Sequence, residues 1–439
     1  MSILTGICLS VDIGTSSLKA ALIDFDGRLM AFSRAAYKPG LPGAPAWERA
    51  FAQALEALHA QAPDCGIDGI CVSGNGPTLV PLTKSGEALP PLYWHDGKTV
   101  LPEEAFRPKS FFLPHAAWLK KNTPEEYEQT DLFVSCHEWL AHKLGAGIFT
   151  VLPQRSYEPY YWDDEQCRLF GLDRKKFPPF VKMGSVMGHV SAEGASSFGP
   201  SAGLKSGIPI ISGGPDFITA LIGTKTLRPG EVCDRAGSSE GINVCASAPI
   251  NSGALRVLPH AKEGLWNIGA VIPASGRLFE KYRVETGQDS RPYEENLAAL
   301  IPEGDETDIF REVLMQPTVA RDSSDSTGRA ILCKMGFAVR AALETLERAG
   351  FAVKEMRVSG GQGKSNRWNQ LKTDIAGVSL MVPEIADGEL AGNAVLTAAA
   401  LGAAPTFEAA AHRMIRIREV YRPKNGAFWE ERYETRYCE

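Results

Sequence analysis

The chain has 439 residues, of which 44% are hydrophobic and 22% charged, proportions typical of globular proteins. This composition excludes a largely disordered chain, a coiled coil and a collagen-like repeat, and the length predicts two or three domains. With 46 Lys and Arg against 52 Asp and Glu, the formal net charge is −6. We therefore expect no nucleic-acid partner and no electrostatic binding to an anionic membrane.

The sequence favours a cytoplasmic location. Its longest weakly apolar run, residues 390–404, contains Asn393 and is too short to cross a bilayer. The apolar N-terminal segment leads directly into Asp12 without a preceding basic region, which is typical of a buried strand and not of a signal peptide. The 9 cysteines include no Cys-x-x-Cys pair, as in reduced proteins. No membrane partner is expected.

The first half of the chain predicts strands that end in glycine-containing turns. Residues 7–24 have the pattern of a β-hairpin with a polar loop at its tip, and residues 51–60 have helical spacing. A strand, a Gly-Asn-Gly turn and a second strand are predicted over 66–82, and mixed helices and loops over 102–199. Residues 205–223 predict a strand, a glycine turn and a helix.

The second half repeats parts of this pattern. Residues 233–246 again place a Gly-Ser-Ser loop between two short apolar runs, and residues 356–382 predict strand, glycine loop, helix and strand. Residues 391–404 predict a helix of small residues suited to close packing. Two halves whose strands end in polar glycine loops indicate two α/β domains facing one cleft. The connection near residues 224–229 divides them into domains 1–224 and 225–439.

Three loops have the composition of phosphate-binding loops. The first consists of Gly14, Thr15, Ser16 and Ser17, whose backbone N–H groups and hydroxyls could hold phosphate oxygens. Asp12, just before it, could orient a hydrated Mg²⁺. An ordinary hairpin turn is the alternative interpretation of this loop.

The other two loops lie in the second half of the chain. One contains Gly237, Ser238 and Ser239, and the other covers residues 359–366 at the start of a predicted helix. The third loop ends in Gly-Lys-Ser, but Val358 stands where a P-loop has glycine. A true P-loop is therefore excluded.

Asp216 lies where a predicted strand turns into a helix, after Gly213-Gly214-Pro215. An aspartate in this position is a common helix N-cap. It can also act as a general base, and the two interpretations are compatible.

Two further patterns are interpreted structurally. The segment HEWLAH, residues 137–142, lacks zinc-protease spacing, because its histidines are five residues apart and lie about 140° apart around a helix. A helix surface is the preferred interpretation. The basic stretch 413–424 is interpreted as the solvated face of a helix. The aromatic stretch 157–162 could stack on a sugar ring or pack in a core.

Taken together and in order, these segments resemble the FGGY carbohydrate kinases, which belong to the sugar kinase/Hsp70/actin superfamily. The resemblance covers nearly the whole chain and rests on DIGTSSLKAALID, VSGNGPTLVPLTKSGEALPPLYWHDGKT, FFLPHAAWLKKNTPEEYEQTD, SGGPDFITALIG, RPGEVCDRAGSSEG, SGGQGKSNRWNQLKTDIAGVSLMV and GNAVLTAAALG. It implies an α/β fold of two actin-like, ribonuclease H-like domains flanking a central ATP and substrate cleft.

The resemblance also implies an activity, the transfer of the ATP γ-phosphate to a hydroxyl of a small sugar, ketose, polyol or sugar acid. The resemblance implies that Asp216 is the general base and that ATP and Mg²⁺ are the cofactors, with Asp12 orienting the Mg²⁺. The implied ATP-binding residues are Gly14, Thr15, Ser16, Ser17, Lys19, Gly237, Ser238, Ser239, Gly360, Gly361, Gln362 and Asn366. The implied substrate-binding residues are Asn75, Gly76, Trp94, Asp96 and Asp216.

The chain departs from the family pattern mainly on the substrate side. Asn75 replaces a frequent Gln, and Gly76-Pro77-Thr78 replaces the Met-His-Gly of xylulokinases. Lys98 replaces an Arg, which exchanges a rigid fork of donors for a point charge. Glu240 stands where Gly is common, and Ser238 where Thr is usual. We expect an altered sugar pocket.

A non-catalytic sugar or nucleotide sensor on the same fold is the alternative function, because the WHDGK segment is altered and the middle of the chain is short. Retention of Asp12, Asp216 and the three loops favours the kinase. The partner expected is a small carbohydrate, and the sequence allows a homodimer.

Overall fold

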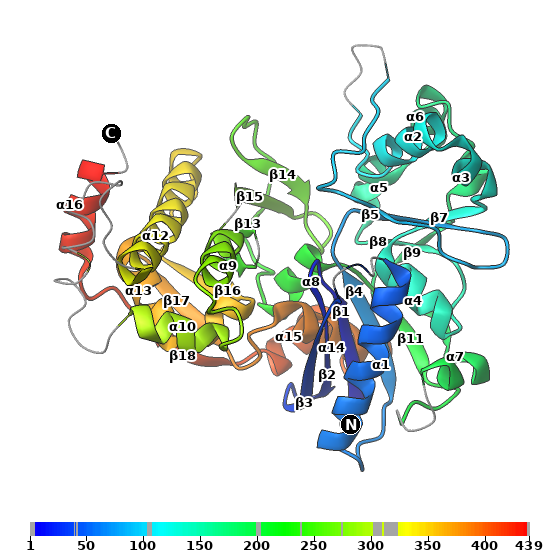
Figure 1. The fold of residues 1–439 in the computed structure, drawn as a ribbon, viewed down its shortest axis with the longest axis horizontal. Coiled ribbons are helices and arrows are strands. Elements are labelled where there is room, and N and C mark those ends of the chain that lie inside the picture. The colour runs from blue at the N-terminus through cyan, green and yellow to red at the C-terminus, as the bar shows by residue number, and fades with distance from the viewer. Residues whose placement is uncertain are drawn as a thin grey trace. The chain divides into compact units, whose positions relative to one another are not determined.

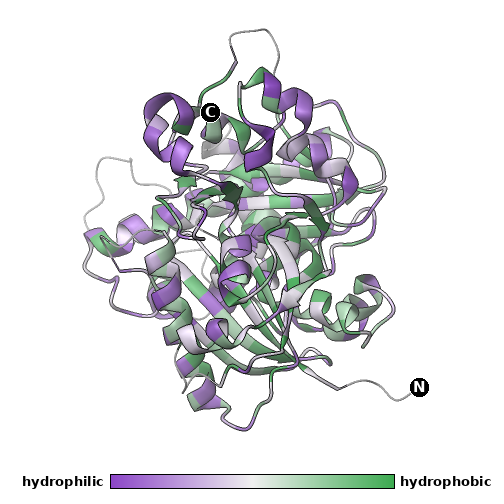
Figure 2. Ribbon diagram, turned by 90° about the vertical axis from the view of Figure 1, so that its right-hand side faces the viewer, coloured by the Kyte–Doolittle hydropathy of each residue, from purple (hydrophilic) through white to green (hydrophobic). Residues whose placement is uncertain are grey.

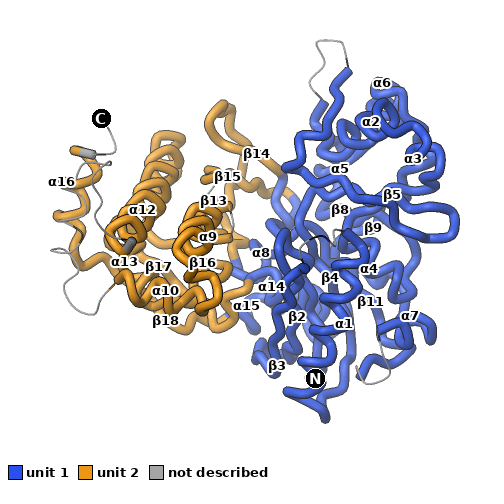
Figure 3. Tube along the Cα trace, in the orientation of Figure 1, with its two compact units in different colours: residues 1–225, 259–263, 388–415 blue, residues 226–258, 264–387, 416–439 orange. Residues whose placement is uncertain are grey.

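The computed structural model describes residues 5–38, 40, 43–102, 108–198, 203–237, 239–273, 275–301, 310 and 324–436 (Figure 1). The strands consist mainly of hydrophobic residues, whereas the helices combine hydrophobic and hydrophilic ones (Figure 2). The chain divides into two compact units, coloured separately in Figure 3. Unit 1 comprises residues 1–225, 259–263 and 388–415, and unit 2 comprises residues 226–258, 264–387 and 416–439. The continuous domains 1–224 and 225–439 remain a prediction.

Unit 1 contains a mixed sheet with the strand order β10-β11-β4-β1-β2-β3 among the described residues. Its strands are β1 Ile7–Ile13, β2 Ser17–Asp24, β3 Leu29–Ala36, β4 Gly69–Gly74, β10 Val186–His189 and β11 Pro209–Pro215. The predicted hairpin is confirmed, because β1 and β2 are antiparallel and the Gly14 N–H donates to the Ser17 carbonyl over 3.0 Å. Strands β1, β4 and β11 are parallel, so their carboxyl ends lie at one edge.

Helices pack on both faces of this sheet. They are α1 Ala44–Gln61, α4 Cys136–Leu144, α8 Asp216–Gly223, α14 Gly388–Ala400 and α15 Phe407–Met414. The Ser10 hydroxyl donates to the Leu390 carbonyl of α14 over 2.8 Å, and the Cys71 thiol donates to Asn393 of the same helix. A Cβ at Gly74 would instead lie 2.5 Å from Cys136 Sγ of α4. Because successive strand residues point to opposite faces, α14 and α4 lie on opposite sides of β4.

Helices α8 and α14 approach each other through glycines, as predicted for the small-residue helix. A Cβ at Gly223 would lie 1.9 Å from the Gly388 carbonyl oxygen, and a Cβ at Gly392 would lie 2.1 Å from the Thr219 carbonyl oxygen. No other residue type leaves room for this contact. The backbones of α14 and α8 are therefore in direct contact.

The middle of unit 1 carries smaller elements. They are β5 Thr78–Leu82, β6 Leu92–Tyr93, β7 Leu132–Val134, β8 Thr150–Leu152, β9 Phe180–Lys182, α2 Leu113–Asn122, α3 Pro124–Gln129, η1 Arg155–Tyr157, α5 Glu158–Tyr161, α6 Asp164–Leu169, η2 Arg174–Lys176 and α7 Ala192–Ser197. The prediction of helices and loops over 102–199 missed the short strands β7, β8 and β9, whereas β5 is the second strand predicted over 66–82. Of the aromatic stretch 157–162, Tyr157, Tyr161 and Trp162 are buried, and Trp162 stacks on Phe180 at 5.3 Å, which favours core packing.

Unit 2 contains a sheet with the order β14-β15-β13-β12-β16-β17-β18 among the described residues. Its strands are β12 Val232–Ala236, β13 Glu240–Ala246, β14 Arg256–Pro259, β15 Trp266–Ile272, β16 Glu355–Ser359, β17 Ser379–Pro383 and β18 Ile417–Tyr421. Its strands in the spatial order β15-β13-β12-β16-β17-β18 pair in the same directions as β3-β2-β1-β4-β11-β10 in unit 1. In each series, two antiparallel pairs are followed by two parallel pairs and a final antiparallel pair. The Gly-Ser-Ser loop between two apolar runs at 233–246 is therefore part of a structural repeat.

The helices of unit 2 are α9 Ser275–Glu285, α10 Tyr293–Leu300, α12 Ser324–Arg348, η4 Gly361–Lys364, α13 Asn366–Ala376 and α16 Gly426–Arg436. One hydrophobic core lies between the sheet and α12, with Val339 and Leu346 fully buried. A second core joins α9, α10, α12, α13 and α16 around Trp368 and Trp429. None of the helices in the described ranges is long and apolar enough to cross a membrane.

Two interpretations of single segments were wrong. His137 does not lie on a helix surface, since it is 4% exposed, and burial lowers the pKa of its imidazole to about 3. The basic stretch 413–424 is not one helix, because α15 ends at Met414 and residues 417–421 form the edge strand β18. Its charged residues Arg416, Arg418, Glu419 and Arg422 are exposed, so the stretch is solvated as expected, although on and beside a strand and not on a helix.

The contact between α8 and α14 predicts that the loss of stability on replacing a glycine by alanine depends strongly on where the glycine lies. Gly392→Ala should destabilise unit 1 by about 1–3 kcal/mol, because the added methyl group overlaps the Thr219 carbonyl. Gly66→Ala is the matched control, since a Cβ there meets nothing within 4 Å. Chemical denaturation of both variants measures the difference. Equal stability of the two would contradict the close approach of the helices.

Candidate functional site

The carboxyl ends of β1, β4 and β11 place polar residues side by side at one edge of the unit 1 sheet. Asp12 is in register with Ser73 of β4, which is in register with Gly214 of β11. Asp216 follows at the start of α8. Parallel strands whose carboxyl ends are followed by loops and helix N-termini are where α/β proteins bind ligands.

Asp12 is buried, and a relay of hydrogen bonds orients its carboxylate. The side chain is 3% exposed, and Ser73 Oγ donates to Asp12 Oδ1 over 2.9 Å. Asn393 Nδ2 of α14 donates in turn to Ser73 Oγ over 3.1 Å and to the Val11 carbonyl over 2.9 Å. Asn393 and Ser73 therefore position Asp12.

The surroundings of Asp12 carry an excess of negative charge. Burial raises the pKa of Asp12 to about 8, and the Glu389 and Asp216 carboxylates add to the rise, while Lys19 opposes it. Lys19 Nζ lies 4.0 Å from Glu389 Oε2. A cation beside Asp12 would be attracted by these carboxylates.

The donor set fits a hydrated divalent cation better than a protein-enclosed metal. Among the described residues there is no group of three or more His, Cys, Asp or Glu side chains arranged to hold a metal ion. Mg²⁺ usually keeps several waters and uses one or two carboxylates together with substrate phosphates. Asp12 is suited to that role.

Asp216 is the first residue of α8, and Pro215 is the N-cap. The Asp216 side chain still serves the helix terminus, because its Oδ1 accepts the Phe217 N–H over 2.6 Å. The side chain is half-buried. A carboxylate in this position is held in place by the helix and is close enough to Asp12 to raise the pKa of the latter.

The first loop, residues 14–17, is held from the β3 side. Tyr37 donates its hydroxyl to the Gly14 carbonyl and its backbone N–H to the Ser16 carbonyl, both over 3.0 Å. Ser17 Oγ accepts a hydrogen bond from Arg34 Nε. Thr15 and Ser16 are exposed and Ser17 is buried, so the tip of the loop faces solvent on a fixed base.

Two of the predicted substrate-binding side chains already have hydrogen-bond partners within the protein. Asn75 is 3% exposed, its Oδ1 accepts the Thr78 hydroxyl over 2.7 Å, and its Nδ2 donates to the Ile13 carbonyl. The Asp96 carboxylate accepts the backbone N–H groups of Tyr93 and Lys98, both over 2.9 Å.

The other predicted substrate-binding residues differ from these two. Trp94 is 43% exposed, and Gly76 forms a cis peptide bond with Pro77. Trp94 therefore presents an accessible aromatic ring.

In unit 2 the predicted nucleotide residues lie on two adjacent turns. The second loop, residues 237–239, joins β12 to β13, and Ser238 lies outside the described residues. The glycine turn, residues 360–364, follows β16. A Cβ at Gly360 would lie 2.5 Å from the Ala236 carbonyl oxygen, and Gln362 Nε2 donates to the Gly237 carbonyl over 3.5 Å. The two turns are therefore in contact.

The exposed parts of these turns are Gly237, Gly361 and Asn366, and Ser239 is half-buried. Asn366 is the first residue of α13, and Ser365 caps that helix by accepting the Trp368 N–H. On its other side the glycine turn is held by Asp387, which lies 3.0 Å from Lys364. Gly361 has no protein atom within 4 Å of a built Cβ.

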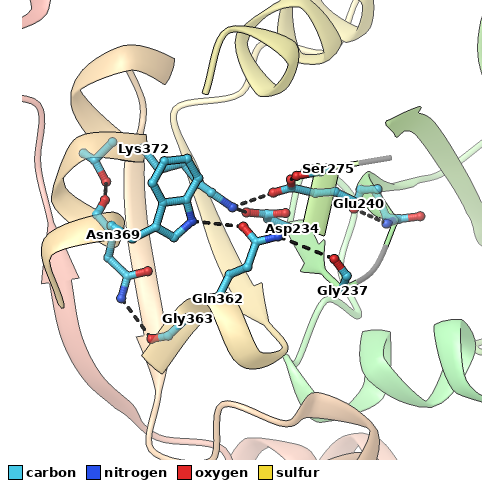
Figure 4. A network of polar contacts seen from close by, with 12 residues as sticks. Asp234, Gly237, Glu240, Ser275, Gln362, Gly363, Asn369 and Lys372 are labelled. Atoms are coloured by element: carbon cyan, nitrogen blue, oxygen red, sulfur yellow. Dashed lines mark hydrogen bonds and ion pairs between the residues drawn. The ribbon is translucent and has the colours of Figure 1, made fainter. Parts of the chain in front are cut away.

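Sequence reasoning missed several residues that shape these sites. They are Tyr37, Arg34, Ser73, Glu389 and Asn393 in unit 1, and Asp234, Ser275 and Lys372 in unit 2. Glu240 is recognisable in the sequence only as a departure from the family pattern, without its buried partners. Asn393 carried a usable signal, because it is a polar residue within a helix of small apolar ones. Figure 4 shows the unit 2 residues.

Comparison with known families identifies two matching segments. Residues 109–223 match the family model described as the FGGY family of carbohydrate kinases, N-terminal domain. Residues 307–401 match the C-terminal domain of the same family.

Individual relatives match nearly the full length. A xylulose kinase of Bacillus subtilis (strain 168) is 23% identical, with 95% of this chain and 92% of the relative covered. An autoinducer-2 kinase of Yersinia enterocolitica is 22% identical, with 94% and 90% covered. The crystal structure of a ligand-bound xylulose kinase from Lactobacillus acidophilus superposes with a TM-score of 0.74 at 18% identity, covering 98% of this chain and 97% of that one. This likeness shows the fold.

The raised pKa of Asp12 predicts a pH-dependent effect of Asp12→Asn on stability. Between the ordinary value of 3.8 and about 8, the folded protein keeps a proton that the unfolded chain releases. Stability due to this group therefore falls as pH rises. Asn cannot ionise, so the melting temperature of the variant should exceed that of the wild type by more at about pH 8 than at about pH 5.

Thermal unfolding in the presence of a chelator measures this difference. The exposed residue Asp64 provides the control variant Asp64→Asn, which should show no such trend. If the difference in melting temperature between Asp12→Asn and the wild type does not increase with pH, the raised pKa of Asp12 is contradicted.

Proposed function

The chain belongs to the FGGY family of carbohydrate kinases, and from this premise we propose that it transfers the γ-phosphate of ATP to a hydroxyl of a small carbohydrate, with Asp216 as the general base. It is a phosphotransferase with an alcohol group as acceptor. The observation that carries the assignment of residues is the placement of Asp216 at the start of α8, directly after β11, whose carboxyl end lies at the same edge of the sheet as that of β1 with the buried Asp12.

The chemistry requires little covalent assistance from the protein. Phosphoryl transfer depends on alignment, on neutralisation of phosphate charge and on a group that accepts the hydroxyl proton. Asp216 is half-buried and fixed at the N-terminus of α8, where its carboxylate can accept that proton from an acceptor hydroxyl within hydrogen-bond distance. The attacking oxygen then bonds to phosphorus as the bond to the leaving ADP oxygen breaks.

Mg²⁺ is proposed beside Asp12. When bound, it supplies positive charge to the phosphate oxygens. Asp12 is suited to orienting its hydration shell because Ser73 and Asn393 fix the carboxylate, and because the adjacent Glu389 and Asp216 leave a local excess of negative charge.

Nucleotide binding is proposed on the three turns. Gly14, Thr15, Ser16, Ser17 and Lys19 of the first hairpin, and Gly237, Ser238 and Ser239 of the second, each offer donors to phosphate oxygens. Gly360, Gly361, Gln362 and Asn366 are proposed to line the nucleoside. The exposed tips of the loops and their fixed bases support this proposal.

The acceptor is proposed to lie against Trp94. Aromatic rings bind the C–H faces of sugars, and Trp94 is 43% exposed, whereas Asn75 and Asp96 are engaged by the protein. The panel of candidate acceptors to be assayed contains a xylulose-like ketose, the compound class of autoinducer-2, a polyol and a sugar acid. A cytoplasmic location and a homodimeric state stay predictions of the sequence, as does the lack of a nucleic-acid partner.

Asp216→Asn should abolish turnover and leave nucleotide binding intact. The amide cannot accept the proton, but it preserves the size and the hydrogen bond to Phe217. ADP release from Mg·ATP is measured across the acceptor panel, and nucleotide affinity is measured by calorimetry. Asp64→Asn serves as the control and should retain full activity. Near-wild-type turnover in Asp216→Asn would exclude this residue as the base.

Gly361→Ala should weaken nucleotide binding without destabilising the fold. A Cβ at this position has no protein atom within 4 Å, so the methyl group can conflict only with a bound ligand. We expect an increase of about ten-fold or more in the KM for ATP, or about 1.4 kcal/mol, with an unchanged melting temperature. Gly253→Ala, in an equally open position of unit 2, is the control. An unchanged KM for ATP in Gly361→Ala would remove this turn from the nucleotide site.

A further inference from the structure

A fully buried ammonium group links α13 to the hairpin β12–β13 in unit 2. Lys372 Nζ lies 2.8 Å from Asp234 Oδ2 and 2.5 Å from Glu240 Oε1, and all three side chains are 0% exposed (Figure 4). The Lys372 ammonium also lies 5.5 Å from the centre of the Trp368 ring. Removing three charges from water is costly, so each depends on the other two.

Glu240 connects this ion cluster to the second loop. It is the first residue of β13, directly after residues 237–239, and pairs with Ala236 at the end of β12. One carboxylate oxygen accepts from Lys372, and the other accepts from the hydroxyl of Ser275 at the start of α9. The C-terminal end of the loop is therefore fixed by two separate helices.

The N-terminal end of the loop is fixed by the same helix, α13, through the glycine turn. Gln362 Nε2 reaches the Gly237 carbonyl, and Gln362 Oε1 accepts the Trp368 Nε1–H over 2.9 Å. Asn369 Nδ2 donates to the Gly363 carbonyl over 2.9 Å. Trp368, Asn369 and Lys372 occupy positions i, i+1 and i+4 of α13, so about one turn of helix holds both the loop and the glycine turn.

A purely stabilising role does not account for this arrangement. Well-packed apolar residues of similar volume commonly stabilise a core as much as a buried ion cluster or more, so its distinctive contribution is a defined geometry. Here the geometry is that of a loop with an exposed tip at Gly237, next to a turn with an exposed Gly361. Both are the unit 2 part of the proposed nucleotide site.

We propose that Lys372 is a positioning residue that fixes the second loop relative to the glycine turn, through Glu240 and Asp234, in the arrangement that binds the nucleotide. This inference rests on the proposed function. It adds three buried residues, none of which contacts the ligand, and a fourth, Ser275, that anchors the other side of Glu240.

The electrostatics of the cluster agree with this geometry. Burial acts to lower the pKa of Lys372, but Asp234 and Glu240 more than offset that effect, so its pKa is raised and the ammonium form is retained. Burial raises the pKa of Asp234 to about 8, with a further rise from Glu240 and a lowering by Lys372. Loss of the ammonium would leave Asp234 and Glu240 adjacent and buried without a cation, so the pair would have to take up a proton or move apart, and either change alters the geometry of the cluster.

The test compares Lys372→Met with Leu346→Ala. Met retains an unbranched chain but removes the charge, whereas Leu346 is a fully buried residue of α12 in the same unit that lies outside the cluster. Calorimetry with Mg·ADP gives the nucleotide affinity, thermal unfolding gives stability, and steady-state kinetics give the KM for the acceptor. If the binding-competent loop falls to about a tenth of the population, the affinity falls about ten-fold.

We expect Lys372→Met to bind Mg·ADP at least about ten-fold more weakly than Leu346→Ala at a comparable loss of melting temperature, with the acceptor KM unchanged. Restoring neutrality with Asp234→Asn and Glu240→Gln in the Lys372→Met background should recover part of the affinity. Equal nucleotide affinity in Lys372→Met and the wild type would overturn the inference while leaving the kinase assignment intact.

Two milder variants cover the case in which Lys372→Met does not fold. Glu240→Gln keeps the hydrogen-bonding partners of the side chain but removes one charge, and Ser275→Ala removes only the second anchor. Both should weaken Mg·ADP binding with little loss of stability, and wild-type affinity in both would overturn the inference. Lack of Mg·ADP binding by the wild type would overturn the proposed function and, with it, this inference.

Discussion

The close approach of α14 to β4 and α8 is the constraint on which the unit 1 site depends. A Cβ at Gly213 would lie 2.1 Å from the Val72 carbonyl oxygen and 2.9 Å from Asn393 Oδ1. Only because glycines remove such overlaps can Asn393 reach Ser73, and Ser73 orient Asp12. The same helix brings Glu389 close enough to influence Asp12. A segment 382 residues away in the chain thus completes the site that the first hairpin begins.

The two sheets repeat one arrangement but secure their loops by different means. In unit 1 the side chain of Ser17, the residue after the loop tip, accepts a hydrogen bond from Arg34 on the neighbouring strand β3. In unit 2 the corresponding Glu240 is held by a buried ammonium and a serine hydroxyl. A neutral hydroxyl needs no counter-charge, whereas a buried carboxylate requires one, so Glu240 and Lys372 are mutually dependent. One change at a loop terminus thereby requires a compensating cation on a distant helix.

The sequence alone predicts what is local. Alternating apolar residues and the positions of glycines predict the hairpin 7–24, the turn at Asp216 and the second hairpin at 233–246, and each is present. Contacts between distant segments are not readable in this way. Lys372 in a helical sequence has the appearance of a surface residue, and nothing adjacent to it indicates two buried carboxylates. His137 likewise follows a surface-like spacing, yet α4 packs it beneath β4.

The predicted substrate-binding segments show that a sequence motif does not by itself establish which side chains are available to bind a ligand. The sequence identifies Asn75 and Asp96 as polar residues in the expected places, but the fold gives their oxygens to Thr78 and to backbone N–H groups. A ligand hydroxyl could pair with the buried Asn75 amide only by displacing an existing bond, and such an exchange gains little free energy. The exposed Asp96 carboxylate, in contrast, can accept further hydrogen bonds. In the proposed acceptor site, the exposed ring of Trp94 offers a further surface on which acceptors can be distinguished. Because an aromatic face discriminates shape and C–H surface more than the pattern of hydroxyls, this proposed contact favours an acceptor with an apolar face.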